Sequence, residues 1–285
     1  MPAAAPVVTA MPMSRAVLLG LVQGVAETVP VSSSAQLTLL PVALGWPDAW
    51  PQGRTTLAAA LHAGSCAGLL FAARADVRAL LTTSSGRRTA ALVAAATVPA
   101  SVAGALLADP VEQRLGRPGP TAALLAAGGV LLWLADRRPQ RHRQVGAPYA
   151  GAAALAQVLA LAPGVSRSGA TLTALRGCAV ARPAAHRFSL LMSLPVTGGA
   201  AVFGLARAVR RDRSGASAPA GAGTPGTPWG PLAVAVPVAA ISAALTHRLL
   251  SARPDRSATG AALYRVALAG VVGARLRRTG REGLL

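Results

Sequence analysis

Apolar residues run along this chain in stretches of about 16–20 residues, separated by short polar loops. The stretches do not alternate with period two, so they predict helices rather than a membrane barrel. Full spans are expected near residues 57–73, 88–107, 121–136, 186–206, 229–249 and 258–275. The pattern therefore predicts an all-α integral membrane protein with six transmembrane helices.

Two further apolar segments, near residues 14–45 and 149–181, are each broken by a proline. Their polar residues correspond, because Gln23 and Gln157 lie 134 residues apart, as do Ser32 and Ser166. Each segment is too short on either side of its proline to cross a bilayer twice, which indicates a re-entrant helix-loop-helix pair.

The correspondence divides the chain into two halves, about 14–136 and 148–275. Each half would hold one re-entrant pair followed by three spans, and an odd number of spans inverts the second half relative to the first. We therefore expect one polytopic membrane domain over residues 1–285, built as an inverted repeat. Residues 212–230 are rich in glycine, proline and alanine and predict a flexible loop.

The composition supports a membrane location. Only 13% of residues are charged, whereas soluble domains have roughly 25%. The net charge of +19 comes from arginine, since the chain has no lysine, and these arginines cluster in the short loops. Such loops suit anionic lipid headgroups, so the bilayer is the expected partner and nucleic acid is not. The two sets of alternating loops carry similar charge, so the positive-inside rule gives no orientation.

Glu27 is the one acidic residue, of nine, that lies inside an apolar segment. An ionisable residue at membrane depth indicates function. Three hydroxyls follow it, at Ser32, Ser33 and Ser34, and they could supply a nucleophile beside a base, or metal ligands.

Arg167 is its natural partner, since it stands between Ser166 and Ser168 at the start of an apolar helix. Free backbone N–H groups, serine hydroxyls and a planar guanidinium make an anion-binding nest suited to phosphate or carboxylate. Thr171 lies in the first turn of this helix, and Arg265 in the last span is expected to face the same site. Weaker candidates are His62, Arg176, His186 and Arg265. A lone histidine on a span more often serves packing or hydrogen bonding.

These residues resemble the undecaprenyl-diphosphate phosphatase family, also called the bacitracin-resistance family. Its two motifs are Glu/Gln-x-x-x-Glu followed by Pro-Val-Ser-Ser, and Pro-Gly-x-Ser-Arg-Ser-x-x-Thr. They stand here at 23–27 with 30–33, and at 163–171, and the likeness covers about residues 14–275. The resemblance implies six transmembrane helices with two re-entrant pairs. It also implies hydrolysis of undecaprenyl diphosphate to undecaprenyl phosphate, the lipid carrier of cell-wall precursors, with a divalent metal, Mg or Ca. The implied location is the inner or plasma membrane, with the site facing outward.

Carried over position by position, the resemblance makes Gln23 and Glu27 the metal-binding residues. Glu27, Ser33 and Arg167 become the catalytic residues. The expected phosphate-binding residues are Ser32, Ser34, Ser166, Ser168, Thr171, Gln36 and Arg265. Three of these, Ser34, Gln36 and Arg265, come from their position rather than from the motifs.

One departure concerns the pair Ala35-Gln36, where many members have Gly-His. Glutamine cannot shuttle a proton near neutral pH, so a histidine at position 36 is expected to raise turnover several-fold. Two roles of Glu27 stay open, metal ligand or base, and two nucleophiles, Ser33 or water. The rival function is a prenyl-phosphate flippase that uses the same anion site without hydrolysis, and a homodimer is also left open.

Overall fold

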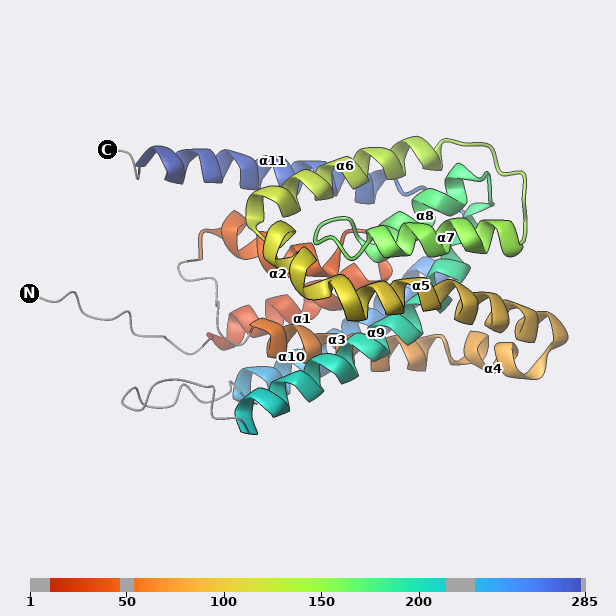
Figure 1. The fold of residues 1–285 in the computed structure, drawn as a ribbon, viewed down its shortest axis with the longest axis horizontal. Helices are drawn as coiled ribbons and strands as arrows, with labels where there is room; N and C mark the ends of the chain where they lie inside the picture. The colour runs from red at the N-terminus through yellow and green to blue at the C-terminus, as the bar shows by residue number, and fades with distance from the viewer. Residues whose placement is uncertain (1–10, 47–53, 214–228, 283–285) are drawn as a thin grey trace, which may run out of the picture.

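The computed structural model describes residues 11–46, 54–213 and 229–282 (Figure 1). These residues form eleven helices and no strand. In chain order the helices are α1 (Met13–Thr28), α2 (Ser33–Leu44), α3 (Arg54–Ala72), α4 (Arg74–Thr82), α5 (Ser84–Leu115), α6 (Pro118–Asp136), α7 (Ala147–Leu159), α8 (Arg167–Gly177), α9 (Arg182–Arg213), α10 (Trp229–Ser251) and α11 (Thr259–Glu282). Most of the loop expected over 212–230 lies outside the described residues.

Four helices, α5, α6, α9 and α10, are long and apolar enough to cross a bilayer. The pair α3 and α4 also meets that test as one span, although it bends by 65°. Large apolar side chains stay exposed on these helices, as at Leu106, Val202 and Ile241, and such surface suits contact with lipid. All six stretches predicted as spans are helical, and four or five of the described elements qualify as candidate spans.

Both proline-broken segments form two short helices joined by a turn. α1 and α2 have 16 and 12 residues, and α7 and α8 have 13 and 11. At about 1.5 Å per residue, none of them reaches the roughly 30 Å of a hydrocarbon core.

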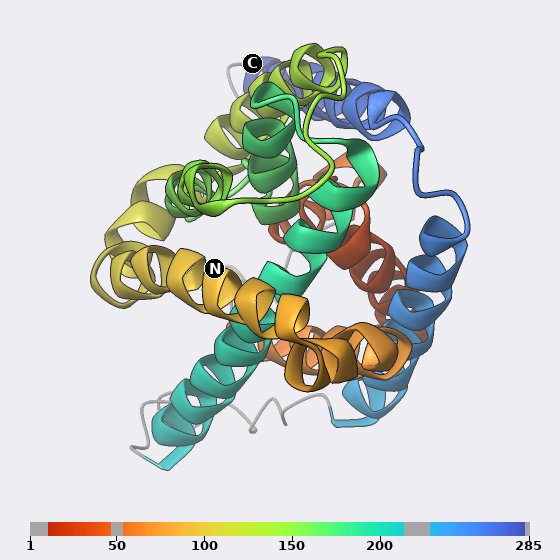
Figure 2. The same ribbon diagram turned by 90° about the vertical axis from the view of Figure 1, so that its right-hand side faces the viewer.

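The second half of the chain repeats the packing of the first. α1 packs against α10, and its counterpart α7 packs against α5, the counterpart of α10. The equivalent helices α6 and α11 pair with each other, as do α3 and α9. Figure 1 shows α6 and α11 side by side and running in opposite directions. Seen from the end in Figure 2, α9 crosses the centre of the molecule, where it contacts α3, α5 and α8.

Small residues let α1 lie almost backbone to backbone against α10. A Cβ atom on Gly20 would lie 2.6 Å from the carbonyl oxygen of Ala235, and one on Gly24 would lie 2.5 Å from the backbone nitrogen of Ala243. Any larger residue would push the two helices apart, which explains the small residues along this interface.

The sequence pattern singled out Glu27 alone among the acidic residues, but the fold also buries Asp136 at the end of α6. Its carboxylate accepts bonds from Arg182 Nε at 2.9 Å, Ser257 Oγ at 2.8 Å and the Ala258 backbone N–H at 3.0 Å, and Arg176 Nε lies 3.3 Å away. A buried carboxylate that is satisfied on all sides ties chain segments together. It fixes the end of α6 to the starts of α9 and α11, and this role accounts for Arg176 as well.

Candidate active site

The two turns that join the short helices have the same backbone geometry. Ser32 and Ser166, the residues just before α2 and α8, have positive φ angles of 68° and 70°. Each serine oxygen accepts the backbone N–H three residues later, from Ala35 at 3.4 Å and from Gly169 at 3.1 Å. Both hydroxyls are therefore helix caps. Non-glycine residues with positive φ are strained and concentrate at functional sites.

Arg265, which is fully buried, holds the two turns together. Its Nη1 donates to Pro30 O in the first turn at 3.3 Å, and its Nη2 donates to Gly164 O at 3.2 Å and Val165 O at 2.8 Å in the second. Its Nε donates to Leu125 O on α6 at 3.1 Å. Arg265, which was expected to bind phosphate, thus donates its hydrogen bonds to four backbone carbonyls.

Gln36 and Thr171 are also engaged with the protein. The Gln36 amide donates to Val31 O at 2.9 Å and accepts the Tyr264 hydroxyl at 2.7 Å. Thr171 Oγ1 lies 2.6 Å from Ser189 Oγ and donates within α8. Both side chains are buried, so both support the turns from behind.

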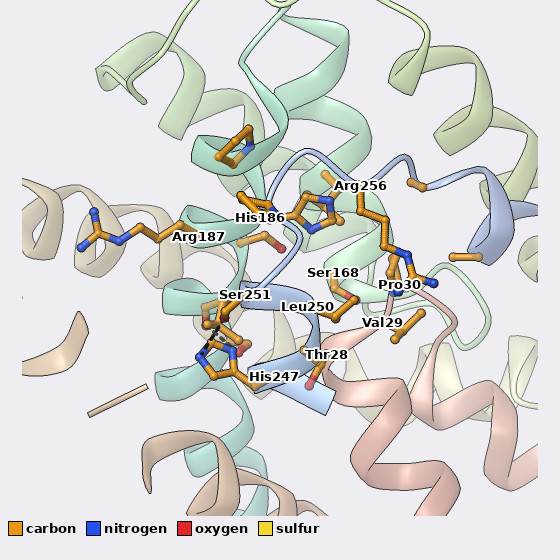
Figure 3. Close-up of a pocket in the computed structure, with 18 of the residues that line it drawn as sticks. Thr28, Val29, Pro30, Ser168, His186, Arg187, His247, Leu250, Ser251 and Arg256 are labelled. Carbon is orange, nitrogen blue, oxygen red and sulfur yellow. Dashed lines mark hydrogen bonds between the residues drawn. The ribbon is translucent and has the colours of Figure 1, made fainter. Parts of the chain in front are cut away.

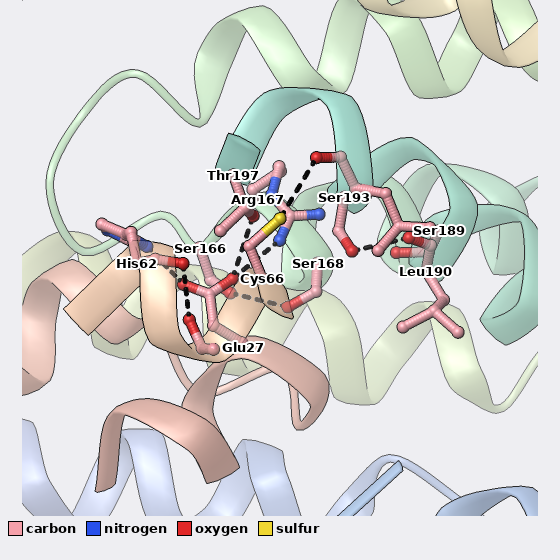
Figure 4. Close-up of polar contacts among 12 residues, drawn as sticks. Glu27, His62, Cys66, Ser166, Arg167, Ser168, Ser189, Leu190, Ser193 and Thr197 are labelled. Carbon is pink, nitrogen blue, oxygen red and sulfur yellow. Dashed lines mark hydrogen bonds and ion pairs between the residues drawn. The ribbon is translucent and has the colours of Figure 1, made fainter. Parts of the chain in front are cut away.

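Glu27 lies at the centre of the site, at the end of α1 (Figure 4). Its Oε2 accepts a bond from Arg167 Nη2 at 3.2 Å and another from Thr197 Oγ1 at 3.2 Å. Its Oε1 lies 2.8 Å from His62 Nδ1 and accepts the Gln23 amide at 2.9 Å. The structure thus joins Glu27 to Arg167, as the sequence predicts, across the two turns.

Several polar groups near this carboxylate have no hydrogen-bond partner among the described residues. They include Nη1 of Arg167, Oγ1 of Thr28 and Oε1 of Gln23. A buried donor left unpaired is costly, and an Arg Nη1 in that state suits the oxygen of an anion. The Ser33 hydroxyl, at the first position of α2, faces the Glu27 carboxylate.

A cavity of about 320 Å³ opens beside this centre (Figure 3). Glu27, Arg167 and Ser168 are the expected site residues that line it. The other expected residues are not among its walls, namely Gln23, Ser32, Ser33, Ser34, Gln36, Ser166, Thr171 and Arg265. The walls also carry basic side chains from α9, α10 and the loop before α11, namely the arginines Arg187, Arg253 and Arg256 and the histidines His186 and His247.

Sequence reasoning undervalued His62 and missed Thr197. His62 lies alone in an apolar stretch, and nothing in its neighbourhood signals a carboxylate from another helix. Thr197 belongs to α9, 170 residues from Glu27, so only the fold brings the two together.

The fold and the site define a helical, multi-pass membrane protein with a charged centre between two duplicated turns. The chain belongs to the family described as bacitracin resistance protein BacA, whose pattern it matches over residues 16–271.

Three curated relatives bear the same name. An undecaprenyl-diphosphatase of Gemmatimonas aurantiaca is 38% identical over 278 residues, which cover 92% of this chain and 97% of that protein. Undecaprenyl-diphosphatases of Geobacter metallireducens and Geobacter sulfurreducens are each 39% identical. The match to the Geobacter metallireducens protein covers 69% of this chain and 77% of that protein. The match to the Geobacter sulfurreducens protein covers 70% of this chain and 78% of that protein.

Proposed function

We propose that this protein hydrolyses undecaprenyl diphosphate to undecaprenyl phosphate and inorganic phosphate. The observation that carries the proposal is the Glu27–Arg167 pair at the cavity wall, whose unpaired Nη1 can receive a phosphate oxygen. The names of the relatives support hydrolysis over the flippase alternative.

The architecture that fits this function is an inverted repeat of six spans with two re-entrant pairs. The support is the shortness of α1, α2, α7 and α8 and the opposite directions of the equivalent helices α6 and α11. The α10–α11 loop contributes to the cavity walls, so the cavity opens at that end of the molecule. We assign this end to the outer side of the inner or plasma membrane, as the family resemblance implies.

Arg167 and Ser168 would bind the terminal phosphate. The Arg167 fork and the N-terminus of α8 supply donors that are fixed in advance, and these stabilise the charge that develops on the phosphoryl oxygens. Glu27 and Gln23 would hold the divalent cation, whose charge would offset that of the diphosphate.

Ser33 is the proposed nucleophile because its hydroxyl faces Glu27, which can accept its proton. Its oxygen would form a bond to the terminal phosphorus while the bond from that phosphorus to the bridging oxygen breaks, which releases undecaprenyl phosphate. Water would then hydrolyse the phosphoserine, which releases inorganic phosphate and returns the proton to Ser33. Gln36, Thr171 and Arg265 would position the turns.

The test is phosphate release by the purified protein in detergent from C55 and C15 prenyl diphosphates, with and without a chelator. We expect release from C55, and loss of release in Arg167→Ala. A folded protein that releases no phosphate under any divalent cation, yet moves the lipid across vesicle bilayers, would support the flippase instead.

The nucleophile has its own readout. Ser33→Ala should abolish turnover, and acid quenching of the unaltered protein should trap phosphoserine at position 33. Substantial turnover in Ser33→Ala would assign the attack to a water molecule activated by Glu27.

A further inference from the structure

Three potential metal-ligand side chains meet on the side of Glu27 that faces away from Arg167. Glu27 Oε1 lies 2.8 Å from His62 Nδ1 and 2.9 Å from the terminal amide nitrogen of Gln23, and that nitrogen lies 3.1 Å from His62 Nδ1. The three atoms form a nearly equilateral triangle. Glu27 and Gln23 are buried, whereas the His62 side chain is 21% exposed.

This triangle has the dimensions of one face of a metal coordination shell. Ligands at about 2.1 Å from a divalent cation in octahedral geometry lie about 3 Å from one another. Among the described residues, no three His, Cys, Asp or Glu side chains gather in this way. The third vertex therefore has to come from the amide of Gln23.

The Gln23 amide can supply an oxygen at that vertex. Its Oε1 has no hydrogen-bond partner within the described part of the chain, so nothing on the oxygen side fixes its orientation. The oxygen and nitrogen of an amide exchange places when the group rotates by half a turn. Rotation would direct Oε1 at the position shared by Glu27 and His62, where a cation would hold it.

We propose that His62 completes a divalent-cation site with Glu27 and Gln23, and that the site prefers Mn²⁺ to Mg²⁺ and Ca²⁺. Imidazole is a poor ligand for Mg²⁺ and Ca²⁺, which take oxygen ligands, and it favours first-row transition metals. Arg167 already balances the Glu27 charge, so a bound cation makes the site net positive, as a diphosphate ligand requires. The metal site itself is argued from the side-chain geometry, and only its diphosphate ligand rests on the proposed function.

The direct test is pulsed electron paramagnetic resonance of Mn²⁺ bound to the full chain in detergent, prepared without a histidine tag. We expect a nitrogen coupling from a directly bound imidazole, lost in His62→Gln. Bound Mn²⁺ without nitrogen coupling, or no bound Mn²⁺, would overturn the proposal, and this holds even if the variant fails to fold.

Affinity gives the second readout. His62→Gln should weaken Mn²⁺ binding at least tenfold and change Mg²⁺ binding much less, while Gln23→Glu should tighten Mn²⁺. His142→Gln, which removes an imidazole from the α6–α7 loop, is the matched control and should bind like the parent. Equal Mn²⁺ affinity in His62→Gln and in the control would refute the role of His62.

The outcomes separate this inference from the proposed function. Nitrogen-coupled Mn²⁺ in a protein that releases no phosphate would keep the metal site and remove the hydrolase. Phosphate release that survives a chelator, in a protein with no Mn²⁺ site, would keep the hydrolase and remove the metal site.

Discussion

At the scale of single residues, the site depends on one carboxylate that serves two sides. Oε2 of Glu27 holds Arg167 and Thr197, and Oε1 holds Gln23 and His62. The carboxylate thus fixes the guanidinium that faces the cavity. The same contacts set the cost of altering either member of the ion pair.

Arg167→Lys should lower phosphate release by about two orders of magnitude or more. Lysine keeps the charge but loses the planar fork, so it cannot hold Glu27 with one nitrogen and a phosphate oxygen with another. The measurement is steady-state turnover of the C55 diphosphate. Arg117→Lys, before α6, is the control and should match the parent. Turnover of Arg167→Lys within about threefold of the parent would remove Arg167 from the site.

Glu27→Gln should abolish hydrolysis and also destabilise the fold. Glutamine has almost the same shape as glutamate but carries no charge, so the change leaves the Arg167 guanidinium buried without its counter-charge. Breaking a buried pair costs about 3–5 kcal/mol, whereas removing both charges can be nearly neutral. Thermal unfolding in detergent should therefore show a lower Tm for Glu27→Gln and a recovered Tm for Glu27→Gln with Arg167→Met, both inactive. A double variant no more stable than the single one would mean that the pair is energetically independent.

At the scale of elements, α11 is the support on which both turns rest. Tyr264 holds Gln36 of α2, and the next residue, Arg265, holds carbonyls of both turns. Two adjacent residues of one helix thus set the spacing between the two halves of the site. This explains why Tyr264 and Arg265 stand near the start of α11 without lining the cavity.

Gln36→His should not raise turnover, contrary to the expectation from the sequence. The Gln36 amide is committed to Val31 O and to the Tyr264 hydroxyl. A histidine there would have to satisfy both partners and would stand behind the turn. We expect equal or lower turnover, with no new limb in the pH profile near pH ~6–7, where histidine titrates. A several-fold gain across that range would show that position 36 reaches the reacting phosphate.

The sequence predicted where most of the helices and both turns lie better than it predicted which side chains contact one another. Length and apolarity located the long helices around the site but not α4, whose Asp76 lines the cavity. The repeated Pro and Ser positions located both turns, because these features are local. The pairing of Glu27 with Arg167 followed from charge at membrane depth. His62 and Thr197 could not be found in this way, since their roles depend on how α3 and α9 pack against α1 and α8. For the same reason the sequence placed Gln36 and Arg265 at the phosphate, although their partners are backbone carbonyls and a tyrosine.

At the scale of the whole molecule, the described residues enclose a cavity that is cationic well beyond Arg167. Its two acidic wall residues are both paired, Glu27 with Arg167 and Asp76 with Arg187. Arg253 and Arg256, exposed on the α10–α11 loop, add positive charge at the open end. A cleft lined by one sign of charge concentrates ligands of the opposite sign, so this end should collect the diphosphate before Arg167 binds it.

Replacing Arg253 and Arg256 together by glutamine should therefore raise KM for the diphosphate about five- to tenfold and leave kcat within about twofold. The two cations act on approach and not on the reacting phosphorus, so their loss should resemble added salt, which screens exposed charges over about 10 Å at 0.1 M. The variant should also show a weaker salt dependence of kcat/KM than the parent. Arg141→Gln with Arg143→Gln removes the same charge from the exposed α6–α7 loop and is the control. A KM shift of equal size in both double variants would mean that the net charge of the protein, and not the position of Arg253 and Arg256, causes the shift. A fall in kcat in the first would place one of these arginines at the reacting group itself.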